Sequence, residues 1–160
     1  MEPSIVTSQL RAAMRMLRTA IEACPARLWN RDTDHNRFWF IAYHTVFYAH
    51  LYASPSEERF EPFTCKGHRY GHLGDGSTLT EDDIRSKQEV LAFWDHVDAR
   101  IESLVRSTPF DAPSGFDWLP FSRGETHLYS LRHIQHHAGQ LSERLRQAEA
   151  IGTRWVGTLS

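Results

Sequence analysis

Hydrophobic residues recur at intervals of three and four positions in four segments of the chain, and polar residues fill the positions between them. This spacing is typical of amphipathic α-helices that bury one apolar stripe. The pattern predicts helices over residues 4–24, 36–53, 80–107 and 122–150. No segment carries the signal of a β-strand, so we expect an all-α fold.

Residues that favour helix ends flank these segments. Asp34 or Asn36 is expected to cap the second helix, because a short polar side chain can accept the first free backbone N–H groups. Thr80 is expected to cap the third helix, and Ser122 opens a capping box for the fourth. Gly152 is the expected stop of the fourth helix, since glycine readily ends a helix in a left-handed conformation.

The second helix carries a histidine at the centre of its apolar face. At about 100° per residue, five large apolar residues lie within about 60° of His44: Phe40, Ile41, Phe47, Tyr48 and Leu51. His50 is displaced from His44 by about 120°. A buried imidazole needs a partner, because an unsatisfied buried polar group costs about 1–3 kcal/mol. A tyrosine hydroxyl, a backbone carbonyl and a metal ion shared with another helix are the three alternatives.

The fourth helix carries His133 and His137 one turn apart, at the edge of its apolar stripe. His136 points away from that stripe, and Gln140 lies on the same side as the histidine pair. Two imidazoles four positions apart can hold one divalent ion, since imidazole suits zinc, nickel, copper and iron. A chain with ten histidines can also show this spacing by chance.

The long connection over residues 54–79 is rich in proline and glycine, which indicates a lid or a crossover that travels the length of a bundle. It contains Cys65, His68 and His72 at a spacing that can serve zinc, although this set is one ligand short of a closed structural site. Surface-loop polarity explains the three residues more simply. A third interpretation is that a histidine or thiol of this loop covers a metal held by the helices.

Four amphipathic helices without strands predict a four-helix bundle with antiparallel-type packing and a long crossover between the second and third helices. The length of 160 residues fits a single domain over residues 1–160. The loop of residues 108–121 carries several aromatic side chains and is expected to pack over one end of the bundle. In such bundles metal sites are built from core-directed side chains on facing helices, so His44 is expected to meet His133 and His137.

Composition narrows the classes of function. The net charge of −2 gives no electrostatic case for nucleic acid or an anionic membrane surface. No apolar run approaches the length of a bilayer span, and the N-terminus lacks the pattern of a signal peptide. Two cysteines do not make a disulfide framework, so we expect a cytoplasmic protein.

Two stretches of the chain resemble the DinB/YfiT-like superfamily: Phe40–Tyr48, which contains His44, and Leu131–Leu141, which contains the signature H-x-x-H-H-x-x-Q. The resemblance implies a four-helix bundle that binds one divalent metal ion through three histidines, here His44, His133 and His137. Members of that superfamily include S-transferases that use bacillithiol or mycothiol and a maleylpyruvate isomerase. Kinship of fold does not transfer a reaction.

The leading hypothesis is a metal-dependent enzyme that acts on a small molecule, either as an S-transferase with a low-molecular-weight thiol cosubstrate or as a hydrolase. Zinc or nickel is the expected ion. Four residues are candidates for a hydrogen bond to a metal-binding histidine or for a contact with substrate: His50, Cys65, His68 and Gln140. The alternatives are a non-catalytic metal- or ligand-binding bundle that serves as a sensor or scaffold, and a metal-free structural bundle. A homodimer is a further expectation.

Overall fold

The structure is a computed structural model that describes residues 2–63 and 79–159. Four long helices dominate it: α1 (Pro3–Ala23), α3 (Phe38–Ala53), α4 (Lys87–Arg106) and α5 (Arg123–Glu149). Two short elements accompany them, the helix α2 (Ala26–Trp29) and the 3₁₀ turn η2 (Glu81–Asp83). The described chain contains no β-strand, which confirms the all-α prediction.

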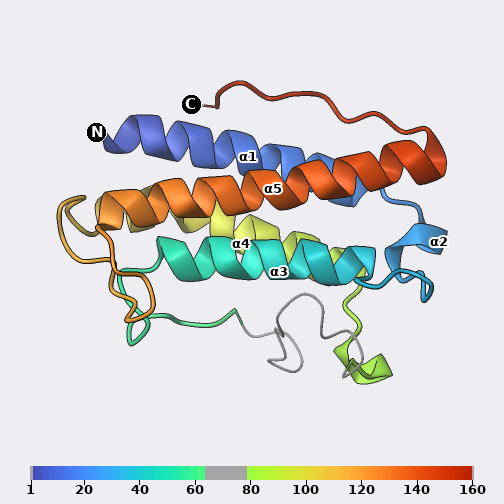
Figure 1. Cartoon of the computed structure of the whole chain (residues 1–160), viewed down its shortest axis with the longest axis horizontal. Helices are drawn as coiled ribbons and strands as arrows, with labels where there is room; N and C mark the ends of the chain where they lie inside the picture. The colour runs from blue at the N-terminus through green and yellow to red at the C-terminus, as the bar shows by residue number, and fades with distance from the viewer. Residues whose placement is uncertain (1, 64–78, 160) are drawn as a thin grey trace.

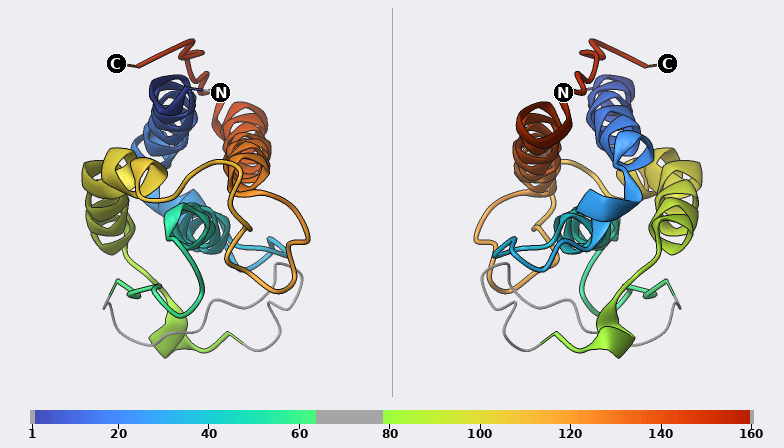
Figure 2. Two further views of the ribbon diagram at one scale, coloured as in Figure 1. Left: turned by 90° about the vertical axis from the view of Figure 1, so that its left-hand side faces the viewer. Right: turned by 90° about the vertical axis from the view of Figure 1, so that its right-hand side faces the viewer.

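The four long helices form a bundle in which α1 and α3 are diagonally opposite, and each of them packs against both α4 and α5 (Figures 1 and 2). Figure 1 shows that α1 and α5 run in one direction and that α3 and α4 run in the other. The expectation of antiparallel packing therefore holds for α1 with α4 and for α3 with α5, and is wrong for the other two neighbouring pairs. Because α3 and α4 are parallel, the chain between them joins opposite ends of the bundle.

Two predicted helix starts differ from the structure, and a third agrees with it. The cap of α3 is Arg37, without a side-chain hydrogen bond, so neither Asp34 nor Asn36 caps it. Thr80 caps only the turn η2, and the helix α4 begins later, where Ser86 forms a capping box with Glu89. The helix α5 begins at the predicted Ser122 cap, whose side chain accepts the Glu125 backbone N–H.

The helix α5 ends at Glu149, close to the predicted bound of residue 150, but the residue that stops it is not the predicted one. Ala150 adopts the left-handed conformation with φ of 56°, two residues before the predicted stop at Gly152. Ile151 beyond it packs against the core. The tail then runs back along α1, where the Thr158 hydroxyl lies 2.6 Å from the Ser8 hydroxyl (Figure 1).

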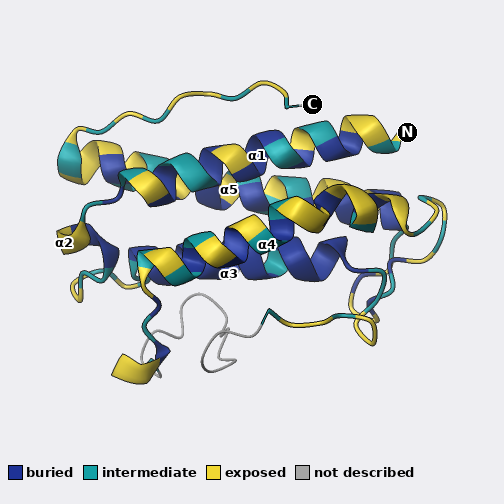
Figure 3. Ribbon diagram, turned by 180° about the vertical axis from the view of Figure 1, so that it is seen from behind, coloured by how far each residue is buried: buried dark blue, intermediate teal, exposed yellow. Residues whose placement is uncertain are grey.

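The helix α3 is buried on almost every side, and only Tyr48 among its sixteen residues is partly exposed (Figure 3). Its sequence explains this, because apolar residues occupy most of its circumference. A histidine on such a helix has little access to water and must be satisfied by its neighbours. None of the helices in the described part of the chain combines the length and the apolar character that a membrane span requires.

Two loops meet over the C-terminal end of α3. The Glu57 backbone N–H donates to the Gly115 carbonyl at 3.1 Å, which joins residues 54–63 to the loop that precedes α5. Gly115 has a φ of 85°, and a Cβ added there would collide with the Pro55 carbonyl oxygen. The fully buried Arg123 donates to the Ala53 and Ser114 carbonyls. These hydrogen bonds join the end of α3 to the loop that precedes α5.

Candidate metal centre and its pocket

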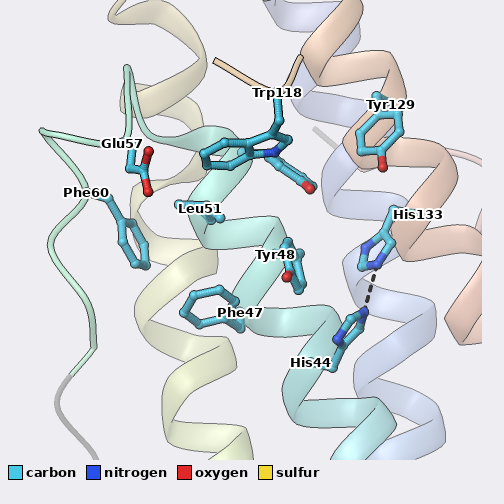
Figure 4. Close-up of a pocket in the computed structure, with 10 residues that line it drawn as sticks. His44, Phe47, Tyr48, Leu51, Glu57, Phe60, Trp118, Tyr129 and His133 are labelled. Carbon is cyan, nitrogen blue, oxygen red and sulfur yellow. Dashed lines mark hydrogen bonds between the residues drawn. The ribbon is translucent and has the colours of Figure 1, made fainter. Parts of the chain in front are cut away.

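Three histidines from two neighbouring antiparallel helices converge inside the bundle. The Nε2 atoms of His44 on α3 and His133 on α5 are 3.0 Å apart (Figure 4). His137 lies one turn further along α5, and one ring nitrogen from each of the three lies within 4.8 Å of the others. The predicted meeting of a core-centred histidine with a vertical pair is therefore present in the structure.

A hydrogen bond fixes the tautomer of His137. Its Nδ1 lies 3.0 Å from the Gln140 side-chain oxygen, one turn along the same helix. Because a carbonyl oxygen accepts, Nδ1 carries the proton and donates it, which leaves Nε2 with a free lone pair. This is the arrangement that orients metal-binding histidines in proteins. Gln140 thus lies behind His137, in the position predicted for it.

Burial keeps the α5 histidines neutral at physiological pH. Burial, followed by the charges of His137 and His136, lowers the pKa of His133 to about 4. Burial also lowers the pKa of His137, although its hydrogen bond with Gln140 acts in the opposite direction. Each neutral imidazole keeps one ring nitrogen with a lone pair, so the cluster is suited to a cation with an affinity for nitrogen.

The structure separates His136 from the cluster. His136 is exposed to solvent, whereas His137 beside it is buried. The ring of His136 lies 4.9 Å from that of His137, but His136 does not belong to the group of ligand atoms that converge. This agrees with the angular position inferred from the sequence.

A pocket of about 530 Å³ opens beside the cluster, and His44 and His133 form part of its wall (Figure 4). The other lining residues are mostly aromatic: Phe47, Tyr48, Leu51, Tyr52, Glu57, Phe60, Trp118 and Tyr129. This pocket was not predicted from the sequence. Part of it could have been predicted from helical spacing. Tyr48 and Tyr52 follow His44 at four and eight positions, and Tyr129 precedes His133 by four, so each lies on the same side of its helix as the histidine.

Tyr52 lines this pocket beside Tyr129. Its ring lies 5.4 Å from that of Tyr129, and its hydroxyl shares hydrogen bonds with Tyr129 and Trp118. Burial, followed by the neighbouring phenols, raises the pKa of Tyr52 well above its usual range. Tyr52 therefore stays neutral and contributes a hydroxyl group rather than a negative charge.

His50 lies away from the cluster, although the sequence made it a candidate for a role there. It is buried toward α4, where its ring lies 5.2 Å from that of His96. Burial, followed by the charges of His96 and Arg100, lowers the pKa of His50 to about 4. His50 lines a different cavity, together with His96 and Arg100.

Cys24, the one cysteine in the described part of the chain, does not line this pocket. Cys24 is buried and unpaired, and burial raises the pKa of its thiol to about 12. Such a thiol is a poor nucleophile at neutral pH. Cys65, His68 and His72, the predicted loop candidates, lie outside the described residues.

The chain was compared with known proteins. Residues 9–141 match the family described as the DinB superfamily. No significant match was found to a curated protein or to a solved structure.

Proposed function

This chain belongs to the DinB superfamily, and from that premise we propose that it binds one divalent metal ion through His44, His133 and His137 and acts on a small molecule. The observation that carries the proposal is the convergence of three imidazoles, two of which, His44 and His133, line a pocket large enough for a ligand. A structural site buried in the core would not need such a pocket.

The donor set fits a metal ion. Two nitrogens bound to a tetrahedral zinc ion at 2.0–2.1 Å are roughly 3.3 Å apart, and the Nε2 atoms of His44 and His133 are 3.0 Å apart. The side of His137 that faces away from Gln140 is free to complete the set. Three protein ligands are the number that leaves a coordination position for a ligand from solution. Zinc and nickel are the ions we propose, because both accept neutral imidazole.

A divalent ion held there would supply Lewis acidity, which polarises an oxygen or lowers the pKa of a water or thiol. The protein contributes the rest through its own residues. Gln140 keeps the proton of His137 on Nδ1, and burial keeps His133 neutral. The aromatic side chains limit the access of water and leave the pocket open to an apolar group of a substrate.

Two reaction types fit this arrangement, an S-transferase with a low-molecular-weight thiol cosubstrate and a hydrolase. The proposed transfer reaction uses a thiol from solution. In the described part of the chain the one cysteine, Cys24, is buried and does not line the pocket. The apolar walls favour a thiol over water as the nucleophile, because a pocket of this kind gives water few hydrogen-bonding partners. We therefore place the S-transferase first.

The test is an activity assay on protein purified without an affinity tag and loaded with zinc or nickel. Low-molecular-weight thiols are combined with electrophiles in one arm, and ester and amide substrates are offered without thiol in the other. We expect thiol-dependent turnover that disappears in His44→Ala and persists in His136→Ala, a matched variant at an exposed histidine. Turnover that is equal in both variants would contradict the proposal.

One observation favours a second function, a non-catalytic sensor or scaffold that binds a metal or ligand. Among the described residues that line the pocket, the only carboxylate is Glu57, which is exposed and comes from a loop. A carboxylate held on a helix, which could act as a general acid or base, is thus not among them. Metal and ligand binding without turnover in any arm of the assay would favour this second function.

A further inference from the structure

The pocket beside the histidine cluster has a defined polarity. Figure 4 shows His44 and His133 at one end and Glu57 and Trp118 at the other. Glu57 is the only lining residue of fixed charge among those described, and neither lysine nor arginine is present. Tyr52, held neutral by burial, adds no second anion.

The walls between the two ends are aromatic. Six of the ten described lining residues are Phe, Tyr or Trp, and Phe60 and Trp118 belong to the same end as Glu57 (Figure 4). The faces of aromatic rings attract cations, and the attraction is strongest for tryptophan. A carboxylate beside such rings favours a positively charged ligand and opposes a negatively charged one.

The position of Glu57 is fixed by the backbone. Its N–H donates to the Gly115 carbonyl, three residues before Trp118, so the carboxylate and the indole are carried by one junction of two loops. Glu58, the next residue, lines other cavities. Leu51 lines the same pocket as His44, and the rise along α3 between these two residues is roughly 10 Å, which guides the length of the probes.

We propose that the pocket takes a small molecule with a cationic amine or ammonium group at the Glu57 and Trp118 end and a metal-seeking group, such as a thiol, at the histidine end. An apolar body lies between them, against the aromatic walls. The inference rests on the proposed metal site for the histidine end alone, because the preference for a cation comes from the opposite end.

Three probes of one length test the charge preference: 6-amino-1-hexanethiol, 6-mercapto-1-hexanol and 6-mercaptohexanoate. Their dissociation constants are measured by isothermal titration calorimetry with zinc-loaded protein under reducing conditions. We expect the amine to bind at least five-fold more tightly than the alcohol, and the carboxylate to bind most weakly. The advantage of the amine shrinks as the salt concentration rises.

Glu57→Gln is the decisive variant, and Glu58→Gln is its matched control. Glu57→Gln should reduce the advantage of the amine over the alcohol to less than two-fold, with little change in the affinity of the alcohol. Glu58→Gln should keep the full advantage. Equal or tighter binding of the carboxylate, or an unchanged advantage in Glu57→Gln, would overturn the inference.

The same probes applied to metal-stripped protein separate this inference from the proposed function. If the order of affinities persists in metal-stripped protein and added zinc does not bind, the cationic end is supported and the proposed metal site fails. If zinc binds stoichiometrically and the three probes bind alike, the metal site stands and the inference is wrong.

Discussion

His127 on α5 should make the stability of the bundle depend on pH. Its side chain is almost fully buried, and neither ring nitrogen has a hydrogen-bond partner among the described residues. It lines a small apolar cavity with residues of α1 and α5. Burial, followed by the charge of Arg123, lowers the pKa of His127 from its ordinary 6.5 to about 3.

The sign of the effect follows from these two values. As the pH falls below 6.5, the unfolded chain takes up a proton that the folded chain refuses until about pH 3. Stability is therefore lost through this window as the pH falls, by up to about 1.4 kcal/mol per pH unit. Between pH 7 and pH 5 the loss due to His127 amounts to roughly 2 kcal/mol.

The assay is urea unfolding of metal-stripped protein at pH 7 and pH 5, for the wild type and His127→Leu. Both proteins keep His50, so its contribution cancels in the comparison. We expect His127→Leu to lose about 2 kcal/mol less stability than the wild type between the two pH values. Thr7→Val is the control, because the Thr7 hydroxyl is also a buried polar group without a described hydrogen-bond partner but does not titrate. Equal losses in the wild type and His127→Leu would refute the reasoning.

Three further predictions concern the cluster and the loop junction. His133→Ala should lose most of the bound metal whereas His136→Ala retains about one ion per chain, as measured by elemental analysis; equal losses would mean that the pair is wrongly placed. Gln140→Leu should weaken zinc affinity by about 10–100-fold in competition with a chelator dye, because it removes the group that orients His137; unchanged affinity would show that Gln140 has no such role. Gly115→Ala should destabilise the fold by more than about 1 kcal/mol in urea unfolding, because alanine is strained at this positive φ and its Cβ meets the Pro55 carbonyl; a neutral effect would count against the tight junction.

The sequence predicted the histidine cluster because its signals are local. The four-residue spacing of His133 and His137 places both on one side of a helix, and the apolar neighbours of His44 mark the buried side of another. The remaining inference was that these two helices pack against each other, and this follows from a four-helix bundle, in which metal sites are built from side chains on facing helices.

The start of α4 was misplaced although the chain contained the relevant signal. Thr80 is followed at three positions by Asp83, and Ser86 is followed at three positions by Glu89, so two capping boxes compete. The first box stabilises only a 3₁₀ turn, and the second begins the long helix. Local propensity alone does not choose between them, because the choice depends on which segment packs against α1 and α3.

The pocket was missed because its walls come from segments far apart in the sequence. Glu57 and Trp118 line the same pocket because the Glu57 backbone N–H bonds to the Gly115 carbonyl, and no periodic pattern in the sequence predicts this contact between two loops. The burial of Arg123 has the same origin, since its partners are carbonyl oxygens of Ala53 and Ser114. The positions of such residues depend on tertiary contacts rather than on the local sequence around them.

The central claim is that His44, His133 and His137 together hold one divalent ion. The measurement that tests it most directly is a titration of metal-stripped protein with zinc and with nickel, in which bound stoichiometry and melting temperature are followed for the wild type and His44→Ala. At a hundred-fold excess over the dissociation constant, binding should stabilise the wild type by about 2.7 kcal/mol, which corresponds to a rise in Tm of roughly 5–10 °C. We predict one ion per chain in the wild type, and a loss of both the ion and the rise in Tm in His44→Ala. If His44→Ala binds the metal as tightly as the wild type, the three-histidine site is wrong and His44 is a residue of the core.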